Sequence, residues 1–143
     1  MDKLISKFSR AMTHLSFKQC GLILEDYRPT FDQVHDIFNS LPKDRTTLYD
    51  KRLIHSSSSQ DYCMYMIKWK VLSISDVHTH PKNGCHMKVL YGKLGEEKHD
   101  ETDKYFSILT KYQQTFTDSN TAHQIINLHM SQSYSLHVYS PVI

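Results

Sequence analysis

From Thr46 onward the chain is a succession of short strand-like segments, with no helical pattern between them. Each segment is rich in aromatic and β-branched residues, and polar or glycine-containing turns separate neighbouring segments. The expected strands are residues 48–55, 62–74, 85–92, 104–116, 121–129 and 133–139. Such a series predicts a mainly β protein, either an antiparallel sandwich or a small barrel.

Helical patterns are confined to the segment that precedes these strands. In residues 2–12 apolar side chains recur at helical spacing, which predicts a helix on the outside of the main fold. A second helix is predicted to begin after Thr30, where Gln33 completes a capping box, and to end at Pro42. We expect both helices to cover a sheet.

Length and composition set the broad class of protein. The 143 residues suffice for one domain, with a helical segment (1–45) followed by the strand region (46–143). Basic residues exceed acidic residues by only 17 to 15 and are scattered, so no nucleic-acid surface is indicated. No apolar run has the length of a membrane span, and the N-terminus lacks a secretory signal pattern. The three cysteines form no C-x-x-C pair, which favours reduced thiols in a cytoplasmic protein.

Two histidines spaced two residues apart are the first candidate for a functional site. In an extended strand His78 and His80 project to the same side, where two imidazoles can hold one metal ion. The segment 81–84 reads as a turn, so the next strand carries Cys85 towards the same cavity. Among the later histidines, His123 is the favoured third ligand. The alternative is that these histidines are hydrogen-bonded or surface groups without a metal.

The last predicted strand carries a second candidate. Ser135, His137 and Tyr139 occupy alternate positions and therefore share one face. A hydroxyl, an imidazole and a phenol in a row can pass hydrogen bonds or a proton, and can hold the phenol oxygen at a set point in a cavity. The alternative is a polar outer face, with Leu136 and Val138 buried instead.

Together these motifs resemble the cupin superfamily and, within it, the cysteine dioxygenase family of thiol dioxygenases. In the usual first cupin motif, H-x-H is followed by three or four residues, a glutamate, six residues and a glycine. Cysteine replaces this glutamate in the mammalian-type cysteine dioxygenases. The matching residues here are His78, His80, Cys85 and Gly92 in the first motif, His123 and Asn127 in the second motif (H-x-x-x-N), and residues 135–141 in the segment S-L-H-x-Y-S-P.

The resemblance implies a single small β-barrel of cupin type, antiparallel and jelly-roll-like, with N-terminal helices. It implies Fe(II) bound by His78, His80 and His123. Because these ligands are all neutral, an incoming thiol would bind as the thiolate. Both atoms of dioxygen would then be added to the sulfur, giving a sulfinic acid.

The resemblance also assigns roles to four further residues. Cys85 and Tyr139 would form a thioether cross-link, and the Tyr139 hydroxyl would point at the bound substrate or oxygen. Ser135 and His137 would orient Tyr139. These four residues complete the predicted catalytic group.

The residue that grips the substrate is less clearly defined by the sequence. The family places an arginine in a Y-x-R pattern to bind the substrate carboxylate. Counting from Tyr49 selects Lys51, whereas the distance to the histidine pair favours Arg52, which we prefer. Only one of the two can face the cavity, since neighbours in a strand point to opposite sides.

The sequence therefore predicts an iron-dependent thiol dioxygenase that oxidises L-cysteine with O2 to cysteine sulfinic acid. The expected partners are a small thiol and O2, with no nucleic acid and no membrane, and a monomer is expected. Another small thiol, cysteamine or 3-mercaptopropionate, is the alternative within enzymes. A non-catalytic metal-binding cupin that acts as a sensor is the alternative outside them, and it needs no cation facing the iron.

Overall fold

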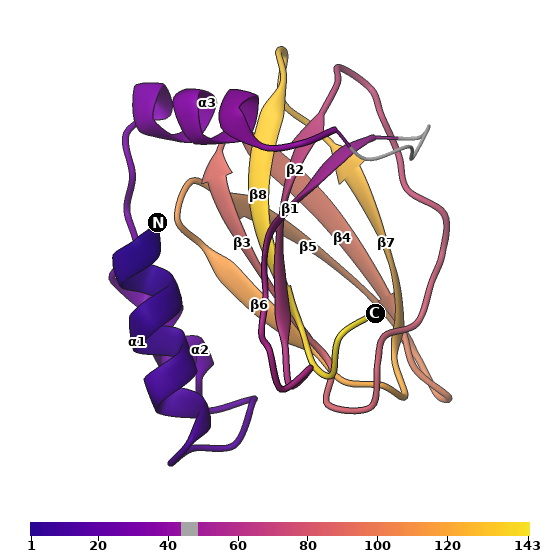
Figure 1. Ribbon diagram of the computed structural model, residues 1–143. Coiled ribbons are helices and arrows are strands. Elements are labelled where there is room, and N and C mark those ends of the chain that lie inside the picture. The colour runs from indigo at the N-terminus through magenta and orange to yellow at the C-terminus, as the bar shows by residue number, and fades with distance from the viewer. Residues whose placement is uncertain (44–48) are drawn as a thin grey trace.

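The structure is a computed structural model that describes residues 1–43 and 49–143 (Figure 1). The described helices are α1 (Asp2–Met12), α2 (Gly21–Glu25) and α3 (Phe31–Ser40). The described strands are β1 (Asp50–Ser56), β2 (Cys63–Trp69), β3 (Cys85–Tyr91), β4 (Lys93–His99), β5 (Lys104–Thr110), β6 (Gln114–Thr117), β7 (Ala122–Asn127) and β8 (Ser133–Tyr139). The predicted boundary at residues 45 and 46, and the predicted strand start at residue 48, lie outside the described residues.

The strands form two antiparallel sheets. One sheet has the order β1-β2-β8-β3-β6 and the other has the order β5-β4-β7. Their facing sides share one apolar core, so the mainly β, jelly-roll-like prediction is confirmed. The sheets do not close into the predicted barrel. After Trp69 the chain leaves the sheet in a turn, and the predicted strand 62–74 ends there.

The five-stranded sheet is buried on both faces, because its side chains alternate between two cores. The helices lie along one side of it (Figure 1), and its outer face packs against them. The outer contacts join Met64, Met66, Leu136 and Val138 to Leu4, Phe8, Val34 and Phe38. The inner face packs against the three-stranded sheet. The inner contacts join Ile67, Trp69, Met87 and Val89 to Leu94, Leu109 and Ile125.

The two predicted helices are confirmed, and a third was missed. At the start of α3, Thr30 Oγ1 accepts from Gln33 N (3.2 Å) and Gln33 Oε1 accepts from Thr30 N (2.9 Å), which is the predicted capping box. The short helix α2 has no capping side chain at its start. Instead Lys88 Nζ, from β3, donates to the carbonyl groups of Leu24 and Glu25 at its end. No described helix is long and apolar enough to cross a membrane.

Two differences from the predicted strands affect the site. Strand β4 was missed because its sequence, KLGEEKH, is mostly charged and resembles a loop. The predicted strand 104–116 is divided by a turn into β5 and β6. Because β4 is the central strand of the three-stranded sheet, its inward side chains lie next to those of β7.

Candidate metal centre

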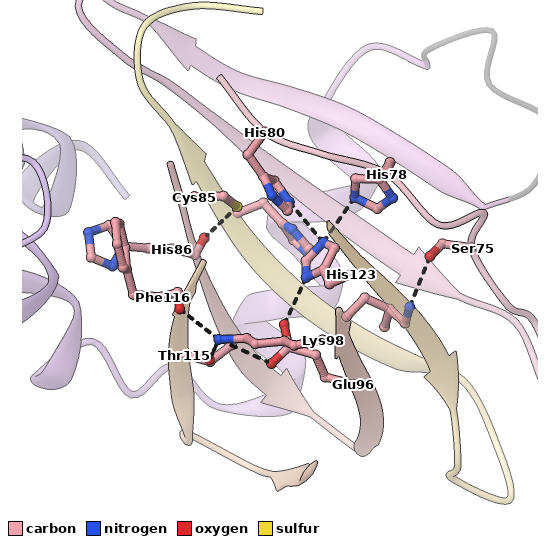
Figure 2. A network of polar contacts seen from close by, with 12 residues as sticks. Ser75, His78, His80, Cys85, His86, Glu96, Lys98, Thr115, Phe116 and His123 are labelled. Carbon is pink, nitrogen blue, oxygen red and sulfur yellow. Dashed lines mark hydrogen bonds and ion pairs between the residues drawn. The ribbon is translucent and has the colours of Figure 1, made fainter. Parts of the chain in front are cut away.

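Backbone pairing brings His78 and His123 together from distant parts of the chain. His78 N donates to His123 O (3.0 Å) and His123 N donates to His78 O (2.9 Å). This pairing joins the loop after β2 to strand β7. His80 lies two residues further along the loop, and its side chain reaches the same place (Figure 2). The predicted approach of His123 to the histidine pair is therefore present.

The three imidazoles converge through their Nε2 atoms. The Nε2 atom of His123 lies 2.9 Å from that of His78 and 2.9 Å from that of His80. The ligand atoms of all three residues lie within 4.8 Å of one another. Two nitrogen ligands about 2.1 Å from one metal and at a right angle to each other are about 3.0 Å apart. The two short distances therefore fit neighbouring ligands of one metal ion, with the third ligand atom close by.

The hydrogen bonds of the outer ring atoms favour a metal over mutual hydrogen bonds. His123 Nδ1 donates to Glu96 Oε2 (2.8 Å) and His78 Nδ1 donates to the Asp76 carbonyl oxygen (3.0 Å). A neutral imidazole has one N–H, so the Nε2 atoms of both rings carry lone pairs. Two lone pairs at 2.9 Å repel each other unless a cation lies between them. The donor set thus fits a divalent metal.

Burial keeps the loop histidines neutral. It lowers the pKa of His80 to about 3, with further lowering by His123 and His78. It also lowers the pKa of His78, with a further contribution from His123. Neutral imidazole is the form that binds metals, so these residues stay competent ligands at physiological pH.

The sequence did not reveal Glu96, although its side chain contacts the candidate metal ligand His123 directly. It lies on the inward face of β4, is 1% exposed, and accepts the hydrogen bond from His123. Lys98 Nζ is 3.8 Å from the other carboxylate oxygen. The available signal was the alternation of Leu94, Glu96 and Lys98, but a strand had not been predicted there.

The predicted row on β8 faces the inside of the sandwich and is longer than expected. Trp69 Nε1 donates to Ser135 Oγ (2.8 Å), which lies 2.8 Å from His137 Nε2. His137 Nδ1 is 3.5 Å from the Tyr139 hydroxyl oxygen. The alternative of a polar outer face is wrong, because helices bury Leu136 and Val138 on that side while the row is buried within.

The chemistry of the donors fixes the direction of the first hydrogen bond in this row. An indole N–H can only donate, so Ser135 Oγ accepts from Trp69 and lies within hydrogen-bond distance of His137 Nε2. Burial first, and then His123, hold the pKa of His137 well below its usual value, so the ring is neutral. In the tautomer that accepts from Ser135, the ring proton is on Nδ1 and points at the Tyr139 oxygen, which leaves the Tyr139 hydroxyl proton for another acceptor.

Tyr139 lies between the metal ligands and two cysteines. Its ring stacks beside that of His80, with centroids 6.4 Å apart. Its register partners are Cys63 on β2 and Cys85 on β3. Burial raises the pKa of the Cys85 thiol and that of the Tyr139 phenol. The cross-strand position of Cys85 suits a bond to Tyr139, and the thioether itself stays a prediction.

Comparisons with known proteins address the fold. No protein-family model matches this sequence, and no curated protein matches it. Among solved structures, Drosophila melanogaster CENP-C bound to CAL1 matches with a TM-score of 0.65 and 13% identity, over 76% of this chain and 94% of that chain. An RmlC-like cupin from Shewanella frigidimarina matches with a TM-score of 0.60 and 12% identity, over 82% of this chain and 92% of that chain. The Fe(II) form of HppE matches with a TM-score of 0.57 and 10% identity, over 71% of this chain and 56% of that chain.

The fold is that of the cupins. At these identities the likeness concerns fold alone. The resemblance of this chain to cysteine dioxygenases rests on its own motifs, and two structural neighbours differ widely in the partner or metal named for them. The chemistry of the site has to be argued from its residues.

The two basic candidates point in opposite directions, and Arg52, the preferred one, points away from the histidines. The Arg52 guanidinium donates to the carbonyl groups of Phe38 (2.9 Å) and Leu41 (3.3 Å) and pairs with Asp50, on the helical side of the sheet. Lys51, one residue earlier, takes the inner face as strand alternation requires. Its Nζ lies 5.1 Å from the centre of the Tyr139 ring.

Tyr49 shares the inner face with Lys51. Its ring packs against Trp69, with centroids 4.7 Å apart. Tyr65 also lies there, with Lys51 Nζ 4.2 Å from the centre of its ring. The spacing counted from Tyr49 was thus a better guide to the inner face than the distance from the histidine pair.

Proposed function

We propose that this cupin is an iron-dependent thiol dioxygenase that converts L-cysteine and O2 to cysteine sulfinic acid. The observation that carries the proposal is the convergence of three imidazole Nε2 atoms beside the stacked ring of Tyr139. Three histidine ligands would leave coordination positions for a thiol and O2, which is the requirement of this reaction class. When bound, Fe(II) would supply the redox chemistry that activates O2.

The protein's own residues would bind and orient the substrate. The ammonium group of Lys51 would attract the substrate carboxylate as a point charge, in place of the two-pronged grip of arginine. The inner faces of both sheets would exclude water from the thiolate. Tyr49 and Tyr65 would form the apolar wall behind the substrate, since both rings lie on the Lys51 side of the sheet.

Tyr139 would act as a hydrogen-bond donor at the reacting end of the substrate. His137 Nδ1, 3.5 Å from the phenol oxygen, would donate its proton to that oxygen. The phenol proton would then be donated to the substrate sulfur or to the oxygen being transferred. Burial raises the pKa of Tyr139 well above its usual value, so the phenol would keep this proton at physiological pH.

The test is anaerobic reconstitution with Fe(II), followed by O2 uptake and mass analysis of products. L-cysteine, 3-mercaptopropionate and cysteamine would be compared. We expect uptake with L-cysteine, its sulfinate as product, and loss of both in His78→Ala. The matched control is His99→Ala, which removes a β4 histidine that pairs with Glu97 and lies outside the ligand set. Stoichiometric iron without uptake on any thiol would overturn the dioxygenase.

A second candidate function is supported by one comparison. The structural neighbour CENP-C was solved bound to CAL1, so a cupin fold of this size can serve as a binding module. In that case iron would bind without turnover, and Lys51→Met would leave every property of the metal unchanged. The same reconstitution experiment separates the two functions.

A further inference from the structure

A buried carboxylate lies directly behind one metal ligand. Glu96 Oε2 is 2.8 Å from His123 Nδ1, and Glu96 and His123 are each 1% exposed. The other two ligands have no buried, hydrogen-bonded carboxylate. His78 Nδ1 donates to the Asp76 carbonyl oxygen, while the Asp76 carboxylate is exposed and 3.8 Å away, and His80 Nδ1 has no hydrogen-bond partner among the described residues. The three imidazoles are therefore electronically unequal.

The position of Glu96 is determined by two strands and a lysine. β4 and β7 are paired, with Glu96 opposite Ile125 and Lys98 opposite His123. Lys98 Nζ donates to Thr115 Oγ1 (2.8 Å) and to Phe116 O (2.7 Å), and lies 3.8 Å from Glu96 Oε1. Figure 2 shows the resulting line of polar contacts from β6 through Lys98 and Glu96 to His123. One oxygen of the Glu96 carboxylate thus contacts His123 and the other lies near Lys98.

A carboxylate in this position does more than orient the ring. It accepts the Nδ1 proton, which directs the Nε2 lone pair at the metal, and its negative charge increases the electron density of the imidazole. In a buried site this charge acts through a low dielectric and is weakly screened. An amide in its place could still accept the hydrogen bond but would carry no charge.

We propose that Glu96 is the positioning residue that makes His123 the strongest donor of the three ligands and so sets the affinity and reduction potential of the bound metal. Lys98 moderates this effect, because its ammonium group attracts the opposite carboxylate oxygen. This inference rests on the metal centre that the proposed function requires, and it does not depend on which substrate is oxidised.

The experiment compares Glu96→Gln with the wild-type protein by two measurements that need no turnover. The first is the affinity for Co(II), measured by competition with a chromogenic chelator. The second is the reduction potential of the bound iron. We expect Co(II) binding to weaken by about 10- to 100-fold, the range found when such partners of metal ligands are removed. We also expect the reduction potential to become more positive, because the charge that stabilises Fe(III) is lost.

Glu97→Gln is the matched control. Glu97 is the next residue along β4, on the opposite face of the strand, where it pairs with His99 (2.7 Å). It should leave affinity and potential at the wild-type values. A Glu96→Gln protein that is folded and also retains both values would overturn the proposal, since Glu96 would then only orient the ring.

A second variant keeps the proposal testable if Glu96→Gln does not fold. Lys98→Met removes the cation beside Glu96 while leaving the carboxylate, so the potential should shift in the negative direction. An unchanged or positive shift would contradict the proposal. A wild-type protein that binds no metal would sink this inference and the proposed function together. Metal binding with the expected Glu96 effect, but without thiol oxidation, would leave this inference standing and remove the proposed function alone.

Discussion

Lys51 and Arg52 are neighbours in β1, and their charged groups lie on opposite faces of the five-stranded sheet. Lys51 Nζ lies over the rings of Tyr65 and Tyr139, on the inner face. The Arg52 guanidinium lies over the ring of Phe38, 4.1 Å from its centre, on the helical face. Lys51 therefore lies on the inner face beside Tyr139 and Arg52 lies against the helices, and two substitutions can separate the roles proposed for them.

Replacing Lys51 should impair the binding of carboxylate-bearing thiols. Lys51→Met keeps a side chain of similar length without charge, so we expect KM for L-cysteine to rise about 10- to 100-fold, the equivalent of one charge-assisted hydrogen bond. Cysteamine, which has no carboxylate, should be unaffected. Lys68→Met is the control, because Lys68 lies near Phe38 on the helical face. Equal effects on both thiols would exclude Lys51 as the carboxylate partner.

Replacing Arg52 should destabilise the fold. Arg52→Met leaves the Phe38 and Leu41 carbonyl groups at the end of α3 without their donor, and removes the partner of Asp50. We expect the free energy of unfolding in urea to fall by about 2–3 kcal/mol. The folded fraction should retain its KM for L-cysteine. A raised KM without loss of stability would contradict these assignments.

Trp69 should influence the phenol that lies three hydrogen bonds away. Trp69→Phe keeps an aromatic ring in the inner core but removes the donor to Ser135, which is then free to reverse its own hydrogen bond. We expect kcat to fall by about tenfold or more, since an acid or base loses efficiency when it is poorly oriented. The pH dependence of kcat should shift as well. Combining Trp69→Phe with Ser135→Ala should add little further loss.

The position of Cys85 predicts a specific covalent product. After aerobic turnover with iron and thiol, a fraction of the protein should be lighter by one pair of hydrogen atoms, through a thioether to Tyr139. Peptide mass mapping should find the linkage in wild-type protein and in Cys63→Ser, and not in Cys85→Ser. Cys63 is the matched control because it is the other register partner of Tyr139. A linkage through Cys63 would show that Tyr139 can react with either of its two register partners.

The metal-free protein should lose stability as the pH falls. His80 has an ordinary pKa of 6.5, and burial lowers it to about 3 in the folded protein. As the pH falls, the unfolded chain therefore binds a proton at His80 before the folded protein does. The contribution of His80 to the free energy of unfolding is complete above pH 6.5 and is lost progressively as the pH falls towards 3. His80→Asn should flatten this dependence in urea titrations at several pH values. His14→Asn, which replaces an exposed histidine, should leave the pH dependence of stability unchanged.

Motif spacing predicted the cluster of three histidines that could hold a metal ion. His78 and His80 share a side by alternation, and the H-x-x-x-N motif selected His123. Alternation could also show that Lys51 and Arg52 point to opposite sides. It could not show which side faces the histidines, because that depends on the pairing of β1 with β2, where Lys51 is opposite the inward Ile67.

Glu96 was missed for a different physical reason. A strand rich in glutamate and lysine has a weak strand propensity, and only tertiary contacts with His123 and Lys98 make the inward carboxylate tolerable. Such contacts join residues that are far apart in the sequence. The predicted strand 62–74 was likewise too long, because the turn after Trp69 has no clear signal in the sequence.

β8 is buried along its whole length, with the polar row on one side and Leu136 and Val138 on the other. A substitution in the helices that shifts Leu136 or Val138 would also move His137 and Tyr139, because odd and even residues share one rigid backbone. A change that loosens the helical core should therefore also disturb the candidate site, although it lies on the other side of the sheet.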